Sequence, residues 1–273
     1  MIYAVDRFGV LGDSAKKHLD AIRIKHSAWF DHGDDLNVIL HDLIPKLNAH
    51  QFNVQELLVA TLFLRALTQY QSVIILARQG LPDECKIILR SLIELVIYLR
   101  AIHKDMDLAQ EYVRSHDRER LKMLATYDKS DFLQSRIPPI DSKTEREKIL
   151  KSLGDKKKDI PLSVYAKAAG LLDVYHTAYK VLCGTVHTGV EDLQRHFNST
   201  DPSTLTEIRY GVSDDEIDHI LLTGTELMLH AMQSVGERFS IPETTVTDAV
   251  VKKHKELAEI DSERDKEPVA QPN

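Results

Sequence analysis

Glycine and proline are scarce in this sequence, and cysteine and tryptophan are scarcer still. The 273 residues include 11 glycines, 9 prolines, 2 cysteines and 1 tryptophan. Glycine and proline make up about 7% of the chain, compared with about 12% in average proteins, which excludes a turn-rich β-sandwich or a collagen-like repeat and favours long helices. The isolated Cys85 and Cys183 are too few for a disulfide framework or a cysteine-ligated zinc site.

Positive charge is also in deficit. The 35 basic residues are outnumbered by 42 acidic ones, which gives a formal net charge of −7. This balance argues against a broad nucleic-acid-binding surface, so an RNA partner would have to bind through a local pocket. The N-terminus lacks a basic segment followed by an apolar one, and we therefore expect no signal peptide and a cytoplasmic location. A hydrophobic content of 43% is enough for a large core and excludes global disorder.

One apolar run, residues 57–77, is long enough to span a bilayer. Arg65 lies near its centre, however, and the next apolar run, residues 87–102, contains Arg90 and Glu94. Charges at mid-depth in a membrane are costly. We therefore expect a buried helical hairpin and no membrane partner.

Caps and apolar periodicity predict a succession of helices, with no strand alternation of useful length and no repeat. The expected helices cover residues 13–30, 34–50, 54–79, 82–104, 107–127, 143–153, 163–187, 213–239 and 242–260. Pro45 is expected to bend or split the second helix, Asn53 and Ser213 to cap helices, Pro82 to occupy a first turn, and Gly170 to interrupt a helix.

The predicted helices 54–79 and 82–104 decide the fold class. Both are apolar nearly all round, which is typical of helices that other helices surround. The short connection between them makes them antiparallel neighbours. We therefore predict an all-α fold, a helical bundle built around a central apolar antiparallel hairpin at about residues 54–103. Residues 1–260 are expected to form a single helical domain, and residues 261–273 a disordered charged tail.

Two basic clusters are expected to be solvated. The first alternates with Asp117 and Glu119 and consists of Arg114, His116, Arg118, Arg120 and Lys122. The second is the lysine run at 156–158. Mixed charges along a helix face and a short lysine run are both typical of exposed surface.

A polar stripe of Arg90, Glu94 and Tyr98 is the most informative feature of the predicted helix 82–104. Its members recur every fourth residue on an otherwise apolar helix. Burying an arginine or a glutamate is costly unless the charge is paired. Two interpretations stay open: a structural Arg90–Glu94 ion pair that fixes helix register, or a site in a cleft where Arg90 meets an anion and Glu94 holds it in place.

A second stripe lies on the predicted helix that ends at His187. Tyr175 and Tyr179 follow the apolar core spacing, while Cys183 and His187 follow an adjacent polar stripe. Gly189 follows closely and can end the helix, and a helix C-terminus favours a cationic imidazole. His187 is therefore either a capping side chain or a general acid–base near neutral pH.

Arg90-x3-Glu94 on an apolar helix, followed by Tyr179 and His187 eight residues apart, resembles the pattern of an uncharacterised family of bacterial helical proteins. That family is a domain of unknown function, and the similarity covers about residues 55–195. Many of its members have serine where Cys183 stands, which argues against an obligatory nucleophile at this position. The resemblance implies an all-helical domain and marks these four residues, but it carries no activity.

More distantly, the chain is similar in style to HEPN-type helical domains, which occur in toxin–antitoxin and antiphage systems. In that family an arginine and a histidine act in metal-independent RNA cleavage, which needs a base for the ribose 2′-hydroxyl and a cation for the phosphate. Arg90 and His187 are the candidates that this resemblance implies. The sequence departs from the family because it has no arginine followed after four to six residues by histidine, so only a tertiary equivalent of the motif is implied.

A metal site is the third possibility. Glu216-x-x-His219 has the spacing used by di-iron bundles, and its stripe continues to His230. Such sites need a second motif on a facing helix, and the nearest match is Asp173-x-x-His176. We therefore interpret the stripe as a solvated face and expect neither a metal nor a cofactor, because nucleotide-binding loops and hydrolase motifs are also missing.

These observations lead to two hypotheses. The first is an intracellular helical-bundle effector, a HEPN-like metal-independent ribonuclease of a toxin system or of phage defence. In it Arg90 binds phosphate, Glu94 orients Arg90, Tyr179 supports them by hydrogen bonding, and His187 is the acid–base. The second is a non-catalytic interaction module in which these residues form a structural network, while outer helices bind a protein partner or a second copy of the chain. An open cleft that brings Arg90 and His187 together favours the first.

Overall fold

The computed structural model describes residues 2–156, 158–186, 193–194, 196–201, 204–208 and 210–264. Its helices are η1 (Gly9–Leu11), α1 (Asp13–Lys25), α2 (Ser27–Leu43), η2 (Ile44–Lys46), α3 (Val54–Arg78), α4 (Pro82–Lys104), α5 (Met106–Asp128), α6 (Asp131–Arg136), α7 (Ser142–Leu153), α8 (Leu162–Ala169), α9 (Leu172–Val174), η3 (Tyr175–Tyr179), α10 (Lys180–Val186), α12 (Ile217–Phe239) and α13 (Thr245–Arg264). Its strands are β1 (Ile2–Ala4), β2 (Phe197–Asp201), β3 (Thr204–Ile208) and β4 (Gly211–Ser213). The predicted all-α bundle is confirmed.

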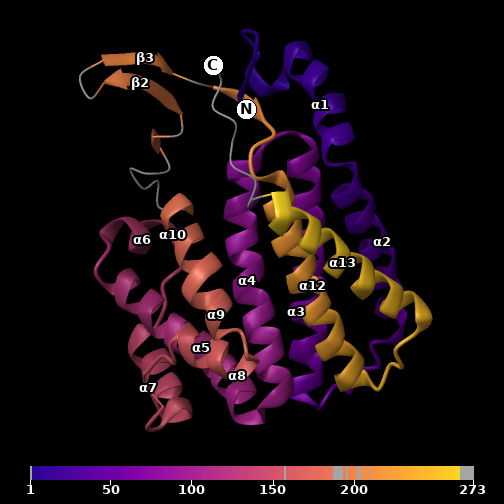
Figure 1. Cartoon of the computed structure of the whole chain (residues 1–273). Helices are drawn as coiled ribbons and strands as arrows, with labels where there is room; N and C mark the ends of the chain where they lie inside the picture. Colours follow the sequence, from indigo (N-terminus) through magenta and orange to yellow (C-terminus); the bar gives the residue numbers. More distant parts are fainter. Residues whose placement is uncertain are drawn as a thin grey trace.

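The centre of the bundle is the antiparallel hairpin of α3 and α4, and α12 packs against both helices (Figure 1). Asn53 caps α3 by accepting a hydrogen bond from the backbone N–H of Glu56 at 3.1 Å, and Pro82 occupies the first turn of α4. Gly80, in the connection, has a φ of +64°, a conformation that other residues rarely adopt. The predicted hairpin and both predicted helix starts are confirmed.

Large buried side chains of α3 and α4 pack into the core of the bundle. Phe63 and Leu92 are completely buried, as expected for helices that are apolar nearly all round. Tyr70 is also buried, and its hydroxyl lies 3.2 Å from the Thr225 hydroxyl of α12 and 3.4 Å from the Gly33 carbonyl of α2. These contacts satisfy the polar end of an otherwise apolar residue and join three helices at one point.

Among the described residues, α3 is the one helix that is long and apolar enough to cross a membrane by length and composition. Half of its most apolar window is buried within the structure, where α3 contacts α4 and α12. The core helix of a soluble protein can have the same length and composition as a membrane-spanning helix. The expected absence of a membrane partner therefore stays a prediction.

The remaining helices surround this centre. α8 and α10 contact α4, and α5 contacts both α4 and α7. On the other side, α2 follows α1 almost end to end, and α13 crosses α2 and α12 (Figure 1). One cluster of buried apolar side chains runs through these helices, from Ala15 of α1 to Val250 of α13.

The break between the first two helices lies earlier in the chain than the predicted one, which falls between residues 30 and 34. α1 ends at Lys25 and α2 begins at Ser27, with His26 between them. Nδ1 of His26 lies 2.6 Å from Oδ1 of Asp218 on α12, so a tertiary contact holds the break. The predicted effect of Pro45 is confirmed, because α2 gives way to the short η2 at this proline.

Four short strands form although none is predicted from the sequence. β1 pairs antiparallel with β4, with Ile2 opposite Ser213, and β2 pairs antiparallel with β3. Each strand has only three to five residues. Such lengths are too short for an alternating pattern to be recognised.

The predicted start of the 213–239 helix is wrong. Ser213 ends β4, where its N–H donates to the Gly80 carbonyl at 2.8 Å and its hydroxyl accepts from the Asp215 N–H at 3.1 Å. The chain then turns through Glu216, which has a left-handed φ of +59°, and α12 begins at Ile217. A serine that suits a helix cap suits a tight turn equally well, because its hydroxyl accepts nearby backbone N–H groups in both.

The predicted solvated face on α5 is wrong for Arg118, which is 3% exposed. Arg118 donates to Glu111 Oε2 at 3.2 Å and to Asp159 Oδ1 at 2.9 Å. Glu111 is buried as well; although burial opposes its ionisation, hydrogen bonds from Arg114 and Arg118 hold the pKa of its carboxyl below the usual value. The segment that carries Asp159 covers this position, a contact that no local charge pattern predicts.

The last helix extends further than predicted. α13 continues to Arg264, past the predicted end at residue 260. Asp261 is buried and accepts a hydrogen bond from Nε1–H of Trp29 on α2 at 2.7 Å. This contact explains why the chain stays helical there. Residues 265–273 of the predicted tail lie outside the described residues, as does Lys157 of the lysine run.

Candidate functional site

The stripe predicted on α4 places two of its three members together. Arg90 and Glu94 are one helical turn apart, and Arg90 Nη2 lies 3.2 Å from Glu94 Oε1. Tyr98 packs elsewhere, with its ring 5.0 Å from that of Tyr112 and 4.9 Å from that of Tyr165, between centroids. The predicted ion pair forms, and Tyr98 belongs to an aromatic group beside it.

Two side chains from the helix opposite complete this group. The Tyr179 hydroxyl donates to Glu94 Oε1 at 2.6 Å and accepts from Arg90 Nη2 at 2.9 Å. Arg90 Nε donates to Cys183 Sγ at 3.3 Å. We refer to Arg90, Glu94, Tyr179 and Cys183 as the Arg90 cluster. Two of its members come from α4, and the other two come from the consecutive segments η3 and α10, about 90 residues later in the sequence.

A single π-helical turn, η3, brings this second pair into place. A π turn contains one more residue than an α turn, and such turns are frequent at functional sites. The extra residue shifts the phase of α10 relative to α9, so that Tyr179 and Cys183 both contact Arg90. Within the turn the rings of Tyr175 and Tyr179 stack at 5.3 Å between centroids. Helical periodicity gives no signal for a π turn, because it assumes a constant 3.6 residues per turn.

Tyr179 is protonated in this environment. Its side chain is almost fully buried. Burial, and next the hydrogen bond to Glu94 and its negative charge, raise the pKa of Tyr179 far above its usual value. The hydroxyl therefore remains a donor to Glu94 at neutral pH and an acceptor for Arg90. The cluster carries one positive and one negative charge, which balance.

The Arg90 cluster reaches solvent at its charged end. The side chains of Arg90 and Glu94 are 23% and 31% exposed. Nε and Nη2 of Arg90 make the contacts above, whereas Nη1 has no hydrogen-bond partner in the described part of the chain. A guanidinium that is fixed along one edge and open at another nitrogen is suited to binding an anion such as a phosphate.

His187, the fourth predicted site residue, lies outside the described residues. It directly follows Val186, the last residue of α10, and comes four residues after Cys183 in the sequence. Gly189, predicted to end this helix, also lies outside the described residues. The structure therefore brings together Arg90, Glu94 and Tyr179, and the assignment of His187 rests on the sequence.

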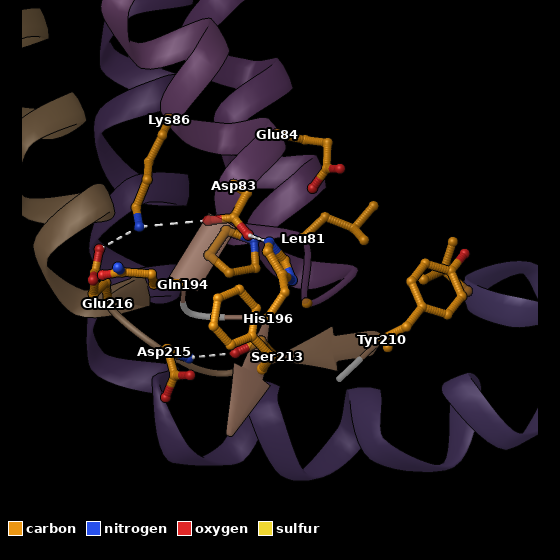
Figure 2. Close-up of a pocket in the computed structure, with 15 residues that line it drawn as sticks. Leu81, Asp83, Glu84, Lys86, Gln194, His196, Tyr210, Ser213, Asp215 and Glu216 are labelled. Carbon is orange, nitrogen blue, oxygen red and sulfur yellow. Dashed lines mark hydrogen bonds and ion pairs between the residues drawn. The ribbon is translucent and has the colours of Figure 1, made fainter. Parts of the chain in front are cut away.

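A cavity of about 510 Å³ lies beside the first turns of α4 (Figure 2). Its lining includes Lys86, four residues before Arg90 on the same helix face, and not Arg90 itself. Lys86 is buried; its Nζ pairs with the carboxylate of Glu216 and lies 3.6 Å from Asp83 Oδ1. His196 Nε2 approaches the other oxygen of Asp83 at 3.5 Å. Lys86 extends the polar stripe of Arg90 and Glu94 by one turn, and this spacing can be seen in the sequence. The cavity itself cannot be predicted from the sequence.

The Glu216-x-x-His219 spacing, interpreted from the sequence as part of a solvated face, lies where β4 gives way to α12. Glu216 precedes α12, and Glu216 and His219 are exposed, as a solvated face requires. His230, at the end of the same stripe, is half-buried. No group of three or more His, Cys, Asp or Glu side chains in the described residues is arranged to hold a metal ion.

The segment from α3 to β3 matches a known protein family. The sequence model of DUF5677, a family of unknown function, matches residues 56–204, more than half of the chain. The chain belongs to DUF5677. The predicted resemblance to a helical family of unknown function is thereby confirmed. No curated protein and no solved structure matches the chain.

The DUF5677 region begins in α3 and ends at the first residue of β3. It contains the whole Arg90 cluster, together with Lys86 and Asp83 of the cavity. α1, α2, α12 and α13 lie outside it, although α12 forms part of the central packing. The candidate site is therefore a feature of the DUF5677 region, whereas Glu216, which pairs with Lys86, comes from outside that region.

Proposed function

We propose that this DUF5677 protein is a helical-bundle effector that cleaves RNA without a metal ion. Arg90 binds the phosphate, Glu94 and Tyr179 hold Arg90 in place, and His187 is the general acid–base. The observation that carries this proposal is the open Nη1 of Arg90, on a guanidinium that Glu94, Tyr179 and Cys183 fix from the other side. The resemblance in style to HEPN-type domains is consistent with this chemistry.

The proposed reaction is an internal transfer at phosphorus. The imidazole of His187 takes the proton of the ribose 2′-hydroxyl, and the 2′-oxygen attacks the phosphorus while the bond to the 5′-oxygen breaks. The leaving 5′-oxygen takes up a proton from water, and the imidazolium of His187 then gives its proton back to the solvent. The products carry a 2′,3′-cyclic phosphate and a 5′-hydroxyl. Arg90 stabilises the added negative charge on the phosphate oxygens. A positioned acid–base of this kind contributes about 10²–10⁴-fold to a rate.

The net charge of −7 restricts how such a protein binds RNA. Contact has to occur at a local pocket, because the surface as a whole repels phosphate. We therefore expect short single-stranded segments to be the substrate, and weak binding that falls further as salt rises. We also propose that the protein acts in the cytoplasm as a toxin or an antiphage effector. Its expression should then slow bacterial growth, and replacing His187 should remove this effect.

Incubating the purified chain with RNA, in EDTA and separately in Mg²⁺, tests this function. We expect cleavage in both buffers, with cyclic-phosphate ends detected by mass spectrometry. His187→Ala and Arg90→Ala should abolish cleavage, and His187→Ala should leave the melting temperature within about 1 °C of the wild type. The exposed His116 supplies a matched control, and His116→Ala should retain full activity.

A second candidate function follows from the internal bonding of the Arg90 cluster. Arg90, Glu94 and Tyr179 are hydrogen-bonded to one another, which also suits a structural network in a non-catalytic module that binds a protein partner or a second copy. RNA that stays intact in both buffers would support this module and reject the ribonuclease. RNA cleavage that survives His187→Ala would reject the assignment of His187.

A further inference from the structure

Two buried histidines, His32 of α2 and His254 of α13, lie against each other beneath α13. They are 0% and 7% exposed, and their rings stack at 5.7 Å between centroids with 30° between planes. Neither nitrogen of His32, nor Nδ1 of His254, has a hydrogen-bond partner among the described residues. Buried nitrogens without partners are costly and rare in native proteins. Such a pair is difficult to explain by packing alone.

The surroundings of the pair join α13 to α2. Trp29 presents its ring edgewise to both histidines, at 5.9 Å from His32 and 5.8 Å from His254. Nε1–H of Trp29 donates to Asp261 of α13 at 2.7 Å. At the rim, outside the buried pair, Lys253 Nζ of α13 pairs with Asp35 Oδ2 of α2 at 2.8 Å. The docked position of α13 therefore depends on contacts centred on these two rings.

The charged form of each histidine is disfavoured here. Burial, then His254 and Lys253, lower the pKa of His32 to about 4, although Asp35 opposes them. Burial also lowers the pKa of His254. A third histidine beneath α13, His230 of α12, also has a lowered pKa. The causes are burial, then the charges of Arg100 and Lys104 of α4, and then His254. All three rings are neutral at pH 7 while α13 is docked.

We propose that the His32–His254 pair is an acid-sensitive latch: its protonation releases α13 from α2 and α12 and leaves the α3–α4–α12 centre folded. An undocked α13 exposes both rings to water, where each binds a proton without the cost of burial. Release also removes one wall of a cavity of about 410 Å³ between α12 and α13, which His230 and Val251 line. Acid therefore exposes an apolar face that is covered at neutral pH.

The direction and the pH window follow from the pKa values. Histidines that are neutral when docked bind protons only in the released state, so docking is strongest above the ordinary histidine pKa of about 6.5 and weakens as pH falls. For His32 the window extends down to about 4. Since each pKa unit changes the equilibrium tenfold, His32 alone shifts docking by on the order of a hundredfold across this window. His254 and His230 add to the shift in the same direction.

Trp29 is the only tryptophan of the chain and therefore reports on the latch directly. Its fluorescence should shift to longer wavelength between pH 6.5 and 4 as water reaches the ring. The hydrogen-exchange protection factors, corrected for the intrinsic exchange rate at each pH, should fall in residues 245–264 over the same range and remain high in α3 and α4. An emission maximum that does not move down to pH 4 would overturn the proposal. Loss of protection in α3 and α4 at the same pH as in α13 would overturn it too, since that is global acid unfolding.

Variants separate the histidine pair from other acid effects. His32→Leu combined with His254→Leu should remove most of the transition within this window and leave only the smaller contribution of His230. The exposed-site control His116→Gln should leave the transition unchanged. If the double variant does not fold, His254→Gln serves instead, because glutamine keeps a polar side chain but does not titrate. Removing one titrating histidine should reduce the pH dependence of the docking equilibrium by up to about tenfold per pH unit. A transition of unchanged midpoint and steepness in His254→Gln would contradict the latch.

Discussion

Glu94→Gln tests whether one carboxylate organises the Arg90 cluster. The substitution keeps the size of the side chain and removes its negative charge. Glu94 Oε1 accepts the Tyr179 hydroxyl at 2.6 Å and faces Arg90 Nη2 at 3.2 Å. A glutamine carbonyl still accepts one hydrogen bond, but it no longer balances the charge of Arg90. We therefore expect a measurable loss of stability and a less ordered Arg90.

The magnitude follows from the burial of each partner. Tyr179 is nearly buried, and a hydrogen bond to a charged acceptor contributes about 1.5–3 kcal/mol, of which a neutral acceptor retains about half. The Arg90–Glu94 pair is partly exposed, and pairs of this kind contribute about 0.3–0.5 kcal/mol. Together these contributions predict a loss of about 1–2 kcal/mol for Glu94→Gln. In a chain of this size that loss lowers the melting temperature by about 2–8 °C.

Urea unfolding and calorimetry at pH 7 measure this loss, with Glu147→Gln as the matched control. Glu147 is an exposed glutamate of α7, and its replacement should change stability by less than about 0.5 kcal/mol. A double-mutant cycle with Tyr179→Phe should give a coupling energy of about 1 kcal/mol. If Glu94→Gln melts with the wild type, or if the two substitutions are fully additive, then Glu94 does not organise the cluster.

Three other substitutions test the packing of the bundle. Arg118→Met removes the buried partner of Glu111, to which Arg114 and Lys156 stay paired, and should cost about 1–3 kcal/mol in urea unfolding; a cost below about 0.5 kcal/mol would contradict the buried network. Gly80→Ala places a Cβ 2.8 Å from Ile22 Cδ1 at a φ of +64°, so the melting temperature should fall by several degrees, and an unchanged value would contradict the turn geometry. Tyr70→Phe removes a hydroxyl that contacts α12 and should cost about 1 kcal/mol; a more stable variant would show that this contact is unimportant.

The α3–α4 hairpin is predictable because its determinants are local. Asn53 and Pro82 mark the helix starts, and both helices are apolar nearly all round, which requires that other helices cover them. The start of α12 is not predictable in this way. Ser213 has the chemistry of a helix cap, but pairing of β4 with β1 and the contact with Gly80 determine its conformation.

The candidate site also has one part that the sequence predicts and another that it does not. The Arg90–Glu94 pair follows from the spacing of four residues on one helix. The contact with Tyr179 joins positions 85 residues apart and depends on a π turn that no period predicts. The burial of Arg118 and the meeting of His32 with His254 are also tertiary, since each requires a distant segment to cover a polar side chain. Sequence patterns identify these residues as polar without indicating what lies above them.

RNA cleavage in EDTA, compared between the wild type and His187→Ala, tests the central claim most directly. The proposed ribonuclease predicts products with 2′,3′-cyclic phosphate ends from the wild type. It predicts at least about a hundredfold less product from the variant, with an unchanged melting temperature. Intact RNA with the wild type in both EDTA and Mg²⁺, or equal cleavage by His187→Ala, would contradict it.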